Sequence, residues 1–320
     1  METPDQSKAY LGLDTPNVRM RKALRASFTN ADIIKSHKQT SMQTVFNIWN
    51  TMSGSSMVSL PWAIQQAGLA MGVFLIAFCG TLCFYTCSII VSLSKNDIDF
   101  SMTIYRYLGK PGQYVALTAS VSVLIGAAAV YFNIMNCCLF GLLGAITEWG
   151  WNHELDFSSN SFTGFTTSHS AVILGGAMLL MSMIRNPAVF MKINSFGAIF
   201  AAGTVTFLTV FGIYNMTKYQ DRFTFSDPVG DQRQIKMIDA GWSDLCGILA
   251  LGFMIHNVVL PIMKNNRHQD KNVRDLGLGY FMVAFCYTCS AVFAYLGWVG
   301  AFGIIQQNCL NNLEFTSVVA

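Results

Sequence analysis

The chain has 320 residues, of which 52% are hydrophobic and only 12% are charged, and its mean hydropathy is +0.42. A typical soluble domain carries about a quarter charged residues, so this composition excludes an ordinary soluble protein and predicts an all-α membrane protein. The formal net charge is only +3. We therefore expect a lipid bilayer as a partner, and no nucleic acid.

Long windows without Asp, Glu, Lys or Arg mark the expected membrane helices, because a spanning helix needs roughly 20 mostly apolar residues. The first window holds two helices that divide near Ala67–Gly72, so seven helices are expected. The fourth helix, Ala171–Ile184, is short and is either a span or a re-entrant segment. The windows are Gln39–Ser94, Pro111–Thr147, Phe157–Ile184, Ile193–Thr217, Leu245–Met263 and Leu276–Leu313.

The basic residues predict the orientation of these helices. If the N-terminus is cytosolic and all seven helices span, 16 of the 20 Lys and Arg residues fall on the cytosolic side. Cytosolic loops of membrane proteins carry an excess of Lys and Arg. Without the fourth span, the basic loop at residues 264–274 would move to the far side, so the pattern favours a span.

The expected organisation follows from these helices. Residues 1–40 are polar and lack the apolar core of a secretory signal, so they predict a flexible cytosolic tail. Residues 97–111 predict a short amphipathic helix on the cytosolic membrane surface. The expected units are a first five-helix repeat at 41–216, a lumenal loop at 217–240, two helices that start a second repeat at 241–300, and a lumenal end at 301–320.

The first helix contains a break. Its sequence "NTMSGSSMVSLPW", Asn50–Trp62, places Ser53–Ser56 in apolar surroundings and follows them with Pro61. An unpaired backbone group in hydrocarbon costs several kcal/mol, so such a break needs protein, water or a ligand as a partner. Two explanations fit, a kink for helix packing or a site where N–H groups bind a carboxylate and carbonyls bind a cation.

The sixth helix contains a matching weak spot at Leu251–Asn257. The segments that follow the two breaks share a Val-x-Leu-Pro pattern, "MVSLPWAI" and "NVVLPIMK". The first helix runs outward and the sixth inward, so the matching units have opposite orientations, as in inverted-repeat transporters whose broken helices form the substrate site. Chance similarity is the alternative for the pattern alone, and the paired breaks favour a binding site.

Other polar residues are weaker candidates. His256 and Asn257 lie inside the sixth helix, where polar and ionisable residues are often functional. His256 is expected either to take part in substrate or proton coupling or to contact water in a cavity. Asn133 and Asn136 line the same cavity or form bonds between helices, and packing is favoured. Asn215-Met216-Thr217 is a glycosylation sequon, but it lies close to the end of the fifth helix.

No enzyme is expected from these motifs. The sequence shows no P-loop, nucleophile elbow, zinc-binding helix pair or pair of intramembrane carboxylates. The nine cysteines suggest no disulfide framework. Cys286 and Cys289 have the spacing of half a zinc site without a second pair, so cysteine is interpreted as a packing residue.

Two blocks carry a family resemblance, "FNIWNTMSGSSMVSLPWAIQQAG" and "FMIHNVVLPIMKNNRHQDKNVRDL". With these blocks, the chain resembles the amino acid/auxin permease family, which has a LeuT-like inverted-repeat fold. The second block resembles the lysosomal, arginine-sensing type of sodium-coupled neutral amino acid transporter. The resemblance implies sodium-coupled transport of arginine and other amino acids across the lysosomal or late endosomal membrane.

The resemblance also implies roles for single residues. Asn50 would help to ligate sodium, and the substrate-binding candidates are Thr51, Met52, Gly54, Ser55, Ser56, His256 and Asn257. The family has about eleven helices, so seven helices imply an incomplete LeuT-like fold and a partial isoform. Signalling to the Rag GTPase/Ragulator complex through residues 1–40 is implied, although its binding motif is not matched there. The alternative function is a non-transporting amino acid sensor or regulatory subunit that signals to the TOR pathway.

Overall fold

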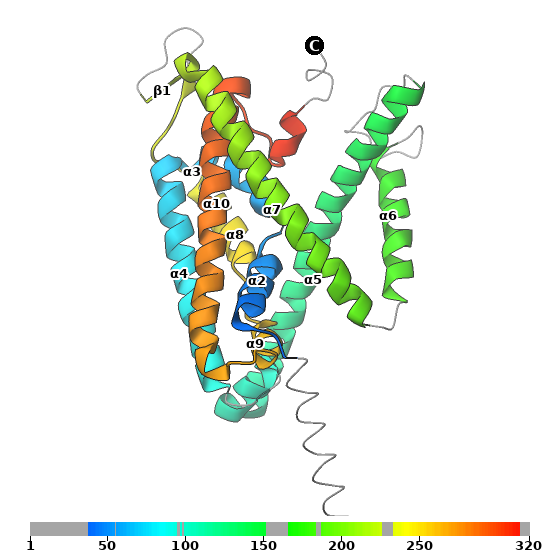
Figure 1. Ribbon diagram of the computed structural model, residues 1–320, viewed down its shortest axis with the longest axis vertical. Helices are drawn as coiled ribbons and strands as arrows, with labels where there is room; N and C mark the ends of the chain where they lie inside the picture. The colour runs from blue at the N-terminus through cyan, green and yellow to red at the C-terminus, as the bar shows by residue number, and fades with distance from the viewer. Residues whose placement is uncertain are drawn as a thin grey trace, which may run out of the picture.

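The computed structural model describes residues 38–54, 56–94, 97, 99–151, 166–183, 187–225 and 233–313, and this part of the chain is mainly helical (Figure 1). The predicted tail at residues 1–37, Ser55 and the end of the chain at 314–320 lie outside the described residues. The elements are α2 (Ser41–Met52), α3 (Ser56–Ala67), α4 (Leu69–Leu93), α5 (Phe100–Trp151), α6 (Thr167–Ser182), α7 (Pro187–Lys218), η2 (Gln220–Arg222), β1 (Phe223–Thr224), β2 (Arg233–Gln234), α8 (Trp242–Gly252), α9 (Val259–Lys264), η3 (Gln269–Lys271), α10 (Asn272–Phe302) and η4 (Cys309–Asn312).

The first predicted membrane helix consists of α2 and α3. Thr40 and Gln43 form a capping box at the start of α2, in which each side chain accepts a hydrogen bond from the other residue's backbone N–H. The helix stops at Met52, and the backbone of Ser53 is extended with φ −70° and ψ 95°. The predicted break in the first helix is therefore confirmed, and its residues lie between two helices of 12 residues each.

A tight turn joins α3 to α4. Gly68 has φ 90°, and a Cβ atom at this position would lie 2.6 Å from backbone atoms of Met237 and Ile238. The N–H groups of Leu69 and Ala70 donate to the carbonyls of Lys236 and Met237, at 2.9 and 3.0 Å. The first N–H groups of a helix have no partner within it. The loop before α8 therefore supplies the cap of α4.

The predicted amphipathic surface helix forms the start of α5. The chain bends at Gly109, where φ is 67° and the backbone is not helical. Before the bend, Arg106 forms an ion pair with Asp97, and the side chains of Tyr107 and Leu108 are exposed. After the bend, α5 continues as a long apolar helix. The prediction of a separate amphipathic segment that ends near Gly109 is confirmed.

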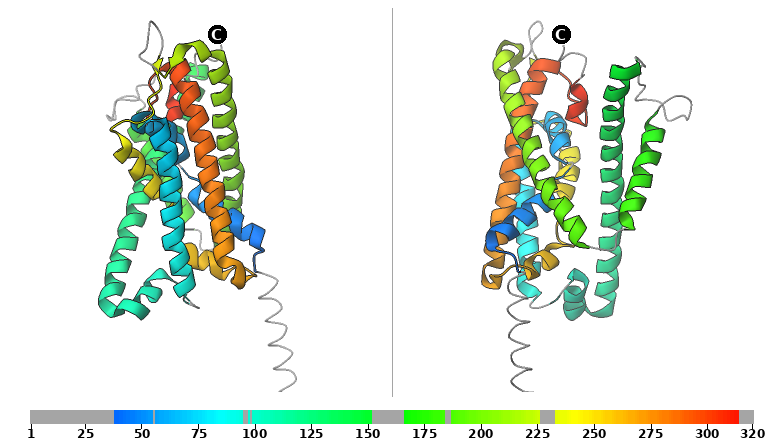
Figure 2. Two further views of the ribbon diagram at one scale, coloured as in Figure 1. Left: turned by 90° about the vertical axis from the view of Figure 1, so that its left-hand side faces the viewer. Right: turned by 45° about the vertical axis from the view of Figure 1, so that its right-hand side comes forward.

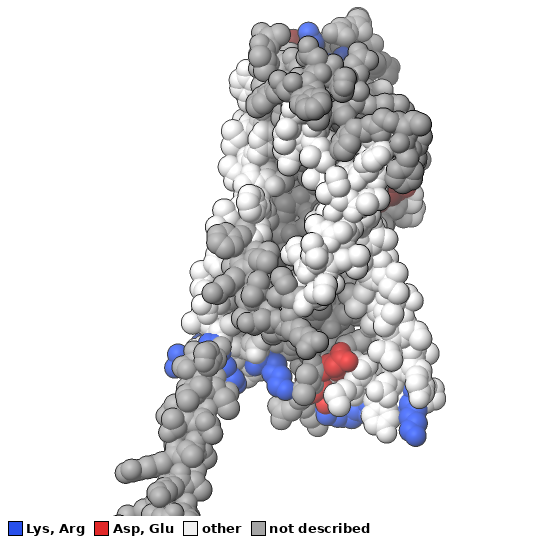
Figure 3. Space-filling view, turned by 90° about the vertical axis from the view of Figure 1, so that its right-hand side faces the viewer, with Lys and Arg blue, Asp and Glu red and all other residues white. Residues whose placement is uncertain are grey.

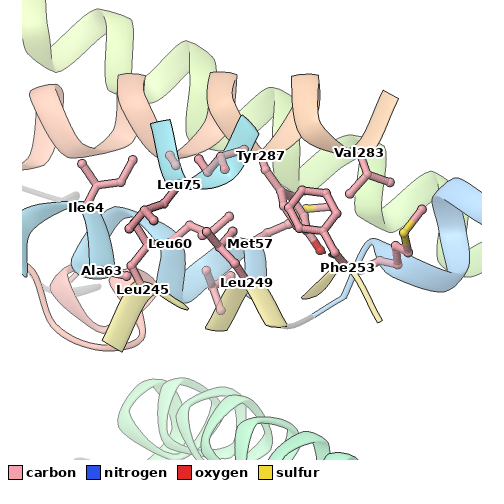
Figure 4. Close-up of a cluster of buried hydrophobic side chains, with 14 of the residues drawn as sticks. Met57, Leu60, Ala63, Ile64, Leu75, Leu245, Leu249, Phe253, Val283 and Tyr287 are labelled. Atoms are coloured by element: carbon pink, nitrogen blue, oxygen red, sulfur yellow. Dashed lines mark hydrogen bonds between the residues drawn. The ribbon is translucent and has the colours of Figure 1, made fainter. Parts of the chain in front are cut away.

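Helix α10 lies at the centre of the helical core and packs most extensively on α7. The two helices touch through glycines, because a Cβ atom on Gly297 would overlap the carbonyl oxygen of Gly212. Figure 4 shows Leu60, Leu249, Phe253 and Tyr287 gathered between α3, α8 and α10. This buried cluster holds the two broken helices against α10.

The described helices fit a multi-pass membrane protein. Leu69–Leu93, Phe100–Gly144, Gly197–Lys218 and Gln269–Phe302 are long and apolar enough to span a membrane, whereas α6 and α8 are apolar but shorter. Lys and Arg gather at the lower end of the face in Figure 3, below a broad uncharged belt. Helices α5 and α6 form a pair that stands beside the core (Figures 1 and 2). The prediction of seven spans and a LeuT-like fold stays a prediction.

The basic loop after α9 is held by buried polar groups. The amide nitrogen of Asn266 donates to Asn272 and to Asp275, both at 2.9 Å. Arg274 donates to the other carboxylate oxygen of Asp275 at 2.7 Å. The backbone of Gln39 pairs with the same loop, because its N–H donates to the carbonyl of Asn265 at 2.8 Å. This network explains why the "KNN…NVRDL" block needs several amides and a carboxylate.

Candidate functional site

The second predicted break is present in the sixth helix. Helix α8 ends at Gly252, and α9 begins at Val259. In Figure 1, α2 lies below α3, whereas α8 lies above α9, so the two broken helices run in opposite directions. The prediction of paired breaks with opposite orientation is therefore confirmed.

Tyr287 of α10 lies between the two breaks and is fully buried. Its phenol oxygen is 2.7 Å from the carbonyl oxygen of Met52, the last residue of α2, and 3.2 Å from that of Gly252, the last residue of α8. The hydroxyl of Ser56, the first residue of α3, is 2.8 Å from the same phenol oxygen. One side chain thus contacts three helix ends.

A cavity of about 500 Å³ lies beside these helix ends. Its wall combines apolar side chains with Ser, Asn, Gln and Tyr, and no charged side chain is among the described residues that line it. The lining residues are Ser56, Ser59, Val130, Tyr131, Asn133, Ile134, Cys137, Gly247, Ile248, Leu251, Gly252, Gln306, Gln307 and Asn308. The described wall therefore offers neutral hydrogen-bonding groups to a small polar molecule.

Two of the predicted first-break residues lie at or near this cavity. Ser56 lines it, and Gly54 lies under the ring of Tyr131, which lines the cavity as well. A Cβ atom on Gly54 would lie 3.1 Å from the phenol oxygen of Tyr131. A larger residue at this position would therefore require the side chain of Tyr131 to move.

The other first-break candidates lie differently. The side chain of Met52 is buried in the core, and its carbonyl faces Tyr287. The hydroxyl of Thr51 donates to the carbonyl of Asn47 at 2.6 Å, and Thr51 is exposed outside the cavity. Asn50 faces α7, with its side-chain oxygen 3.7 Å from a Cβ position on Gly197. The structure does not describe Ser55.

His256 and Asn257 face neighbouring helices, and their expected role in substrate binding stays a prediction. The ring nitrogen Nε2 of His256 is 2.8 Å from the hydroxyl of Thr86 on α4. The side-chain oxygen of Asn257 accepts a hydrogen bond from Ser120 on α5 at 3.0 Å. Neither residue lines the cavity. The unwound segment between α8 and α9 turns both side chains towards neighbouring helices, where they join the break to the bundle.

The two asparagines of α5 have different positions. Asn136 accepts a hydrogen bond from Ser170 at 2.6 Å and donates to the carbonyl of Thr167, so it joins α5 to α6 as the packing interpretation expects. Asn133 lines the cavity instead. The third sequence candidate, Asn215, lies within α7 and is only 4% exposed. This burial argues against glycosylation of Asn215, because an acceptor asparagine must be accessible.

The sequence did not reveal several residues of the site. Tyr287 has no distinctive motif around it, and only its position two turns after Tyr280 on an apolar helix places it in the core. Gln65 donates to the carbonyl of Gly303 at 2.7 Å and accepts from the N–H of Ile305 at 2.9 Å. These bonds fix the segment that follows α10, which brings Gln306 and Asn308 to the cavity.

Comparison with known proteins identifies the family of the chain. The profile of the family described as "Transmembrane amino acid transporter protein" matches residues 37–320. A Caenorhabditis elegans protein named "Sodium-coupled neutral amino acid transporter 9 homolog" is 30% identical over 345 aligned residues, which cover 89% of this chain and 54% of that protein. "Neutral amino acid transporter 9" of Rattus norvegicus is 28% identical, with 88% of this chain and 58% of that protein covered.

A shorter similarity involves "Solute carrier family 38 member 10" of Rattus norvegicus, which is 26% identical over 94 residues, or 28% of this chain and 8% of that protein. The chain spans less than two thirds of the length of the relatives that it matches over most of its own length. The profile match covers both broken helices and the loop after α9. This family consists of transporters and not of enzymes. It is the amino acid/auxin permease family that the two sequence blocks resemble. The chain therefore belongs to the transmembrane amino acid transporter protein family.

Proposed function

We propose that this protein is an amino acid transporter whose substrate binds in the cavity beside Ser56. The observation that carries the proposal is the meeting of two antiparallel broken helices at Tyr287, next to a cavity with an uncharged polar wall. Broken helices of this kind form the substrate sites of inverted-repeat transporters. On this proposal α2–α3 and α8–α9 are corresponding helices of a LeuT-like fold.

The site offers a partner for each charged group of an amino acid. The N-terminus of α3 begins at Ser56 and carries N–H groups and a partial positive charge that favour a carboxylate. The carbonyl ends of α2 and α8 lie nearby and favour an ammonium group. The amides of Asn133, Gln306 and Asn308 offer neutral donors and acceptors for a polar side chain, including that of arginine.

Sodium coupling is the second part of the proposal. Sodium prefers oxygen ligands, and the end of α2 carries the side-chain oxygen of Asn50 together with carbonyls. In the same segment, the hydroxyl of Ser53 is buried and has no hydrogen-bond partner among the residues that the structure describes. The printed name of the Caenorhabditis elegans relative describes sodium coupling for that protein. We therefore propose sodium as a co-transported ion with Asn50 among its ligands.

The proposed location is the lysosomal or late endosomal membrane, with the N-terminus in the cytosol. It rests on the sequence resemblance and on the excess of Lys and Arg in the segments assigned to the cytosol. The proposed partner there is the Rag GTPase/Ragulator complex, bound through residues 1–40. Gln39, next to this segment, is held on the loop after α9 by backbone hydrogen bonds with Asn265 and Arg267. Deletion of residues 1–37 should abolish co-purification of this complex.

The decisive experiment is uptake by the purified 320-residue chain in proteoliposomes. Labelled glutamine and arginine are offered with an inward sodium gradient, with a potassium gradient as control. The proposal expects uptake that depends on sodium and is absent from empty liposomes. Binding of amino acids without uptake would instead favour a non-transporting sensor. Absence of both binding and uptake would overturn the proposal.

A matched pair of glycine variants tests the position of the site. Gly54→Leu should abolish amino acid binding, because its side chain would fill the space under Tyr131. Gly176→Leu is the control, since a Cβ atom at Gly176 on α6 meets no atom within 4 Å. Unchanged affinity in Gly54→Leu, with the protein still folded, would place the substrate elsewhere.

A further inference from the structure

The hydroxyl of Tyr287 joins two breaks that are about 200 residues apart in the sequence. A phenol carries a single proton, so it donates to one carbonyl at a time or shares its proton between two. The distances of 2.7 Å to Met52 and 3.2 Å to Gly252 place both acceptors in reach. The hydroxyl of Ser56 is 2.8 Å from the phenol oxygen, and when the phenol donates to a carbonyl, Ser56 is left to donate to the phenol. A shift of one break thus changes the bonding of the other.

These carbonyls need such a partner. The last carbonyls of a helix have no donor within that helix. Here both helix ends are buried within apolar residues, including Phe253 and Met57 (Figure 4). An unpaired carbonyl in such surroundings is strongly unfavourable. The hydroxyl of Tyr287 is within hydrogen-bond distance of both carbonyls, and its ring packs against Phe253 with the centroids 5.3 Å apart.

Two other buried tyrosines of α10 do not have this arrangement. Tyr280 donates to the carbonyl of Phe253 at 3.0 Å and so contacts only the sixth-helix break. Tyr295 is 1% exposed and is hydrogen-bonded to the backbone of Lys236, which lies in the loop before α8 and belongs to neither break. Tyr287 therefore differs from its neighbours by joining the two breaks, and its buried position alone does not set it apart.

We infer that Tyr287 is a positioning residue that holds the breaks of the first and sixth helices in a fixed register. The inference deepens the proposed function, because this register sets where Ser56 and the start of α3 stand at the cavity. Tyr287 itself does not line the cavity, so it acts through the groups that do. Its hydroxyl is the group that connects the break of the first helix to the break of the sixth helix.

The first experiment needs no ligand. Amide hydrogen exchange is measured by mass spectrometry on the full 320-residue protein in nanodiscs, for wild type, Tyr287→Phe and Tyr295→Phe. Loss of a buried hydrogen bond weakens local structure, so exchange should become about tenfold faster. Tyr287→Phe should show this in peptides that cover both Met52–Met57 and Gly252–Val258. Tyr295→Phe should leave both peptides unchanged.

The second experiment separates positioning from general stability. Thermal midpoints and the affinity for labelled glutamine are measured for the same three proteins. Both variants lose a buried hydroxyl and should unfold at lower temperature than wild type, but only Tyr287→Phe should bind glutamine about tenfold more weakly. Equal affinity in wild type and Tyr287→Phe would overturn the positioning role.

The exchange data also distinguish this inference from the proposed function. Faster exchange at both breaks in Tyr287→Phe supports the positioning role, whether or not the wild-type protein binds an amino acid. If the wild-type protein binds no amino acid, only the transporter proposal is contradicted. Faster exchange at one break only, or equally fast exchange in Tyr295→Phe, would overturn the inference, because the two breaks would then be independent or the effect would be general.

Discussion

Gly54 in the first break lies directly beneath Tyr131 of α5, where a Cβ atom would come within 3.1 Å of the phenol oxygen. The long helix α5 thus covers the break, and the cavity opens next to this contact. The contact between Gly54 and Tyr131 thus connects the break of the first helix to α5, which otherwise stands beside the core (Figure 2). Its geometry leads to the first prediction.

Gly54→Ala should weaken amino acid binding, because the new methyl group must displace the side chain of Tyr131, which lines the cavity. A displacement that costs the bound state about 1.4 kcal/mol lowers the affinity about tenfold. The double variant Gly54→Ala with Tyr131→Phe should regain part of the affinity, since the phenol oxygen that meets the new methyl group is removed. Equilibrium binding of labelled glutamine measures both effects. Failure of the double variant to improve on the single one would show that Gly54 is needed for another reason.

Gly297→Ala should destabilise the protein through the contact between α10 and α7. The new methyl group would overlap the carbonyl oxygen of Gly212, so the two helices must separate. At about 1–3 kcal/mol for overpacking, the thermal midpoint should fall by several degrees. Gly203→Ala on α7 is the matched control, because its methyl group meets no atom within 4 Å and should not lower the midpoint. Equal midpoints for the two variants would contradict close packing of α7 on α10.

Gln65→Leu should release the segment that follows α10. Both hydrogen bonds from the Gln65 side chain to Gly303 and Ile305 would be lost. A suitable reporter is Cys309, which is 0% exposed and whose thiol has its pKa raised by burial to about 12. A thiol reacts as its thiolate, so Cys309 should react slowly with maleimide from pH 7 to pH 9.

In a variant that retains Cys309 alone among the cysteines, Gln65→Leu should increase the rate of maleimide labelling at least tenfold, since local release exposes the thiol and lowers its pKa. Gln66→Leu, which changes the next residue and leaves the two hydrogen bonds intact, is the control. Equal labelling rates in all three proteins would show that Gln65 does not hold this segment.

The loop that caps α4 should resist mild acid. Hydrogen bonds from Lys236, at 2.6 Å, and from the N–H of Ala240 lower the pKa of the Asp239 carboxyl below its ordinary value of 3.8. A carboxyl whose pKa is lowered by folding stabilises the folded state above its unfolded pKa, and this contribution disappears as pH falls through the folded value. The loop should therefore stay intact at pH 5 and loosen only below about pH 4.

Hydrogen exchange of the loop at residues 236–241 between pH 6 and pH 3, corrected for intrinsic exchange, measures this effect. Wild type should lose protection only at the acid end of the range. Asp239→Asn should remove the pH dependence, because it has no carboxyl group to protonate. A loss of protection near pH 5 in wild type would contradict the lowered pKa of Asp239.

Local sequence features determined much of the architecture. Charge-free windows predicted the membrane helices and the division near Ala67–Gly72, and Ser53–Ser56 predicted the first break, because each depends on the chemistry of a few neighbouring residues. The two sequence blocks also predicted the family. The same features predicted that both broken helices matter, since a break in hydrocarbon needs a compensating partner.

The tertiary structure alone decided which groups are those partners. Tyr287 meets Met52 and Gly252 only because α10 packs between segments that are 200 residues apart, and no local pattern encodes that distance. The sequence places His256 and Asn257 in the break of the sixth helix. The direction of their side chains, however, depends on contacts with Thr86 and Ser120 of other helices. Composition and spacing thus fix where a helix breaks, whereas the packing of distant helices fixes what the break faces.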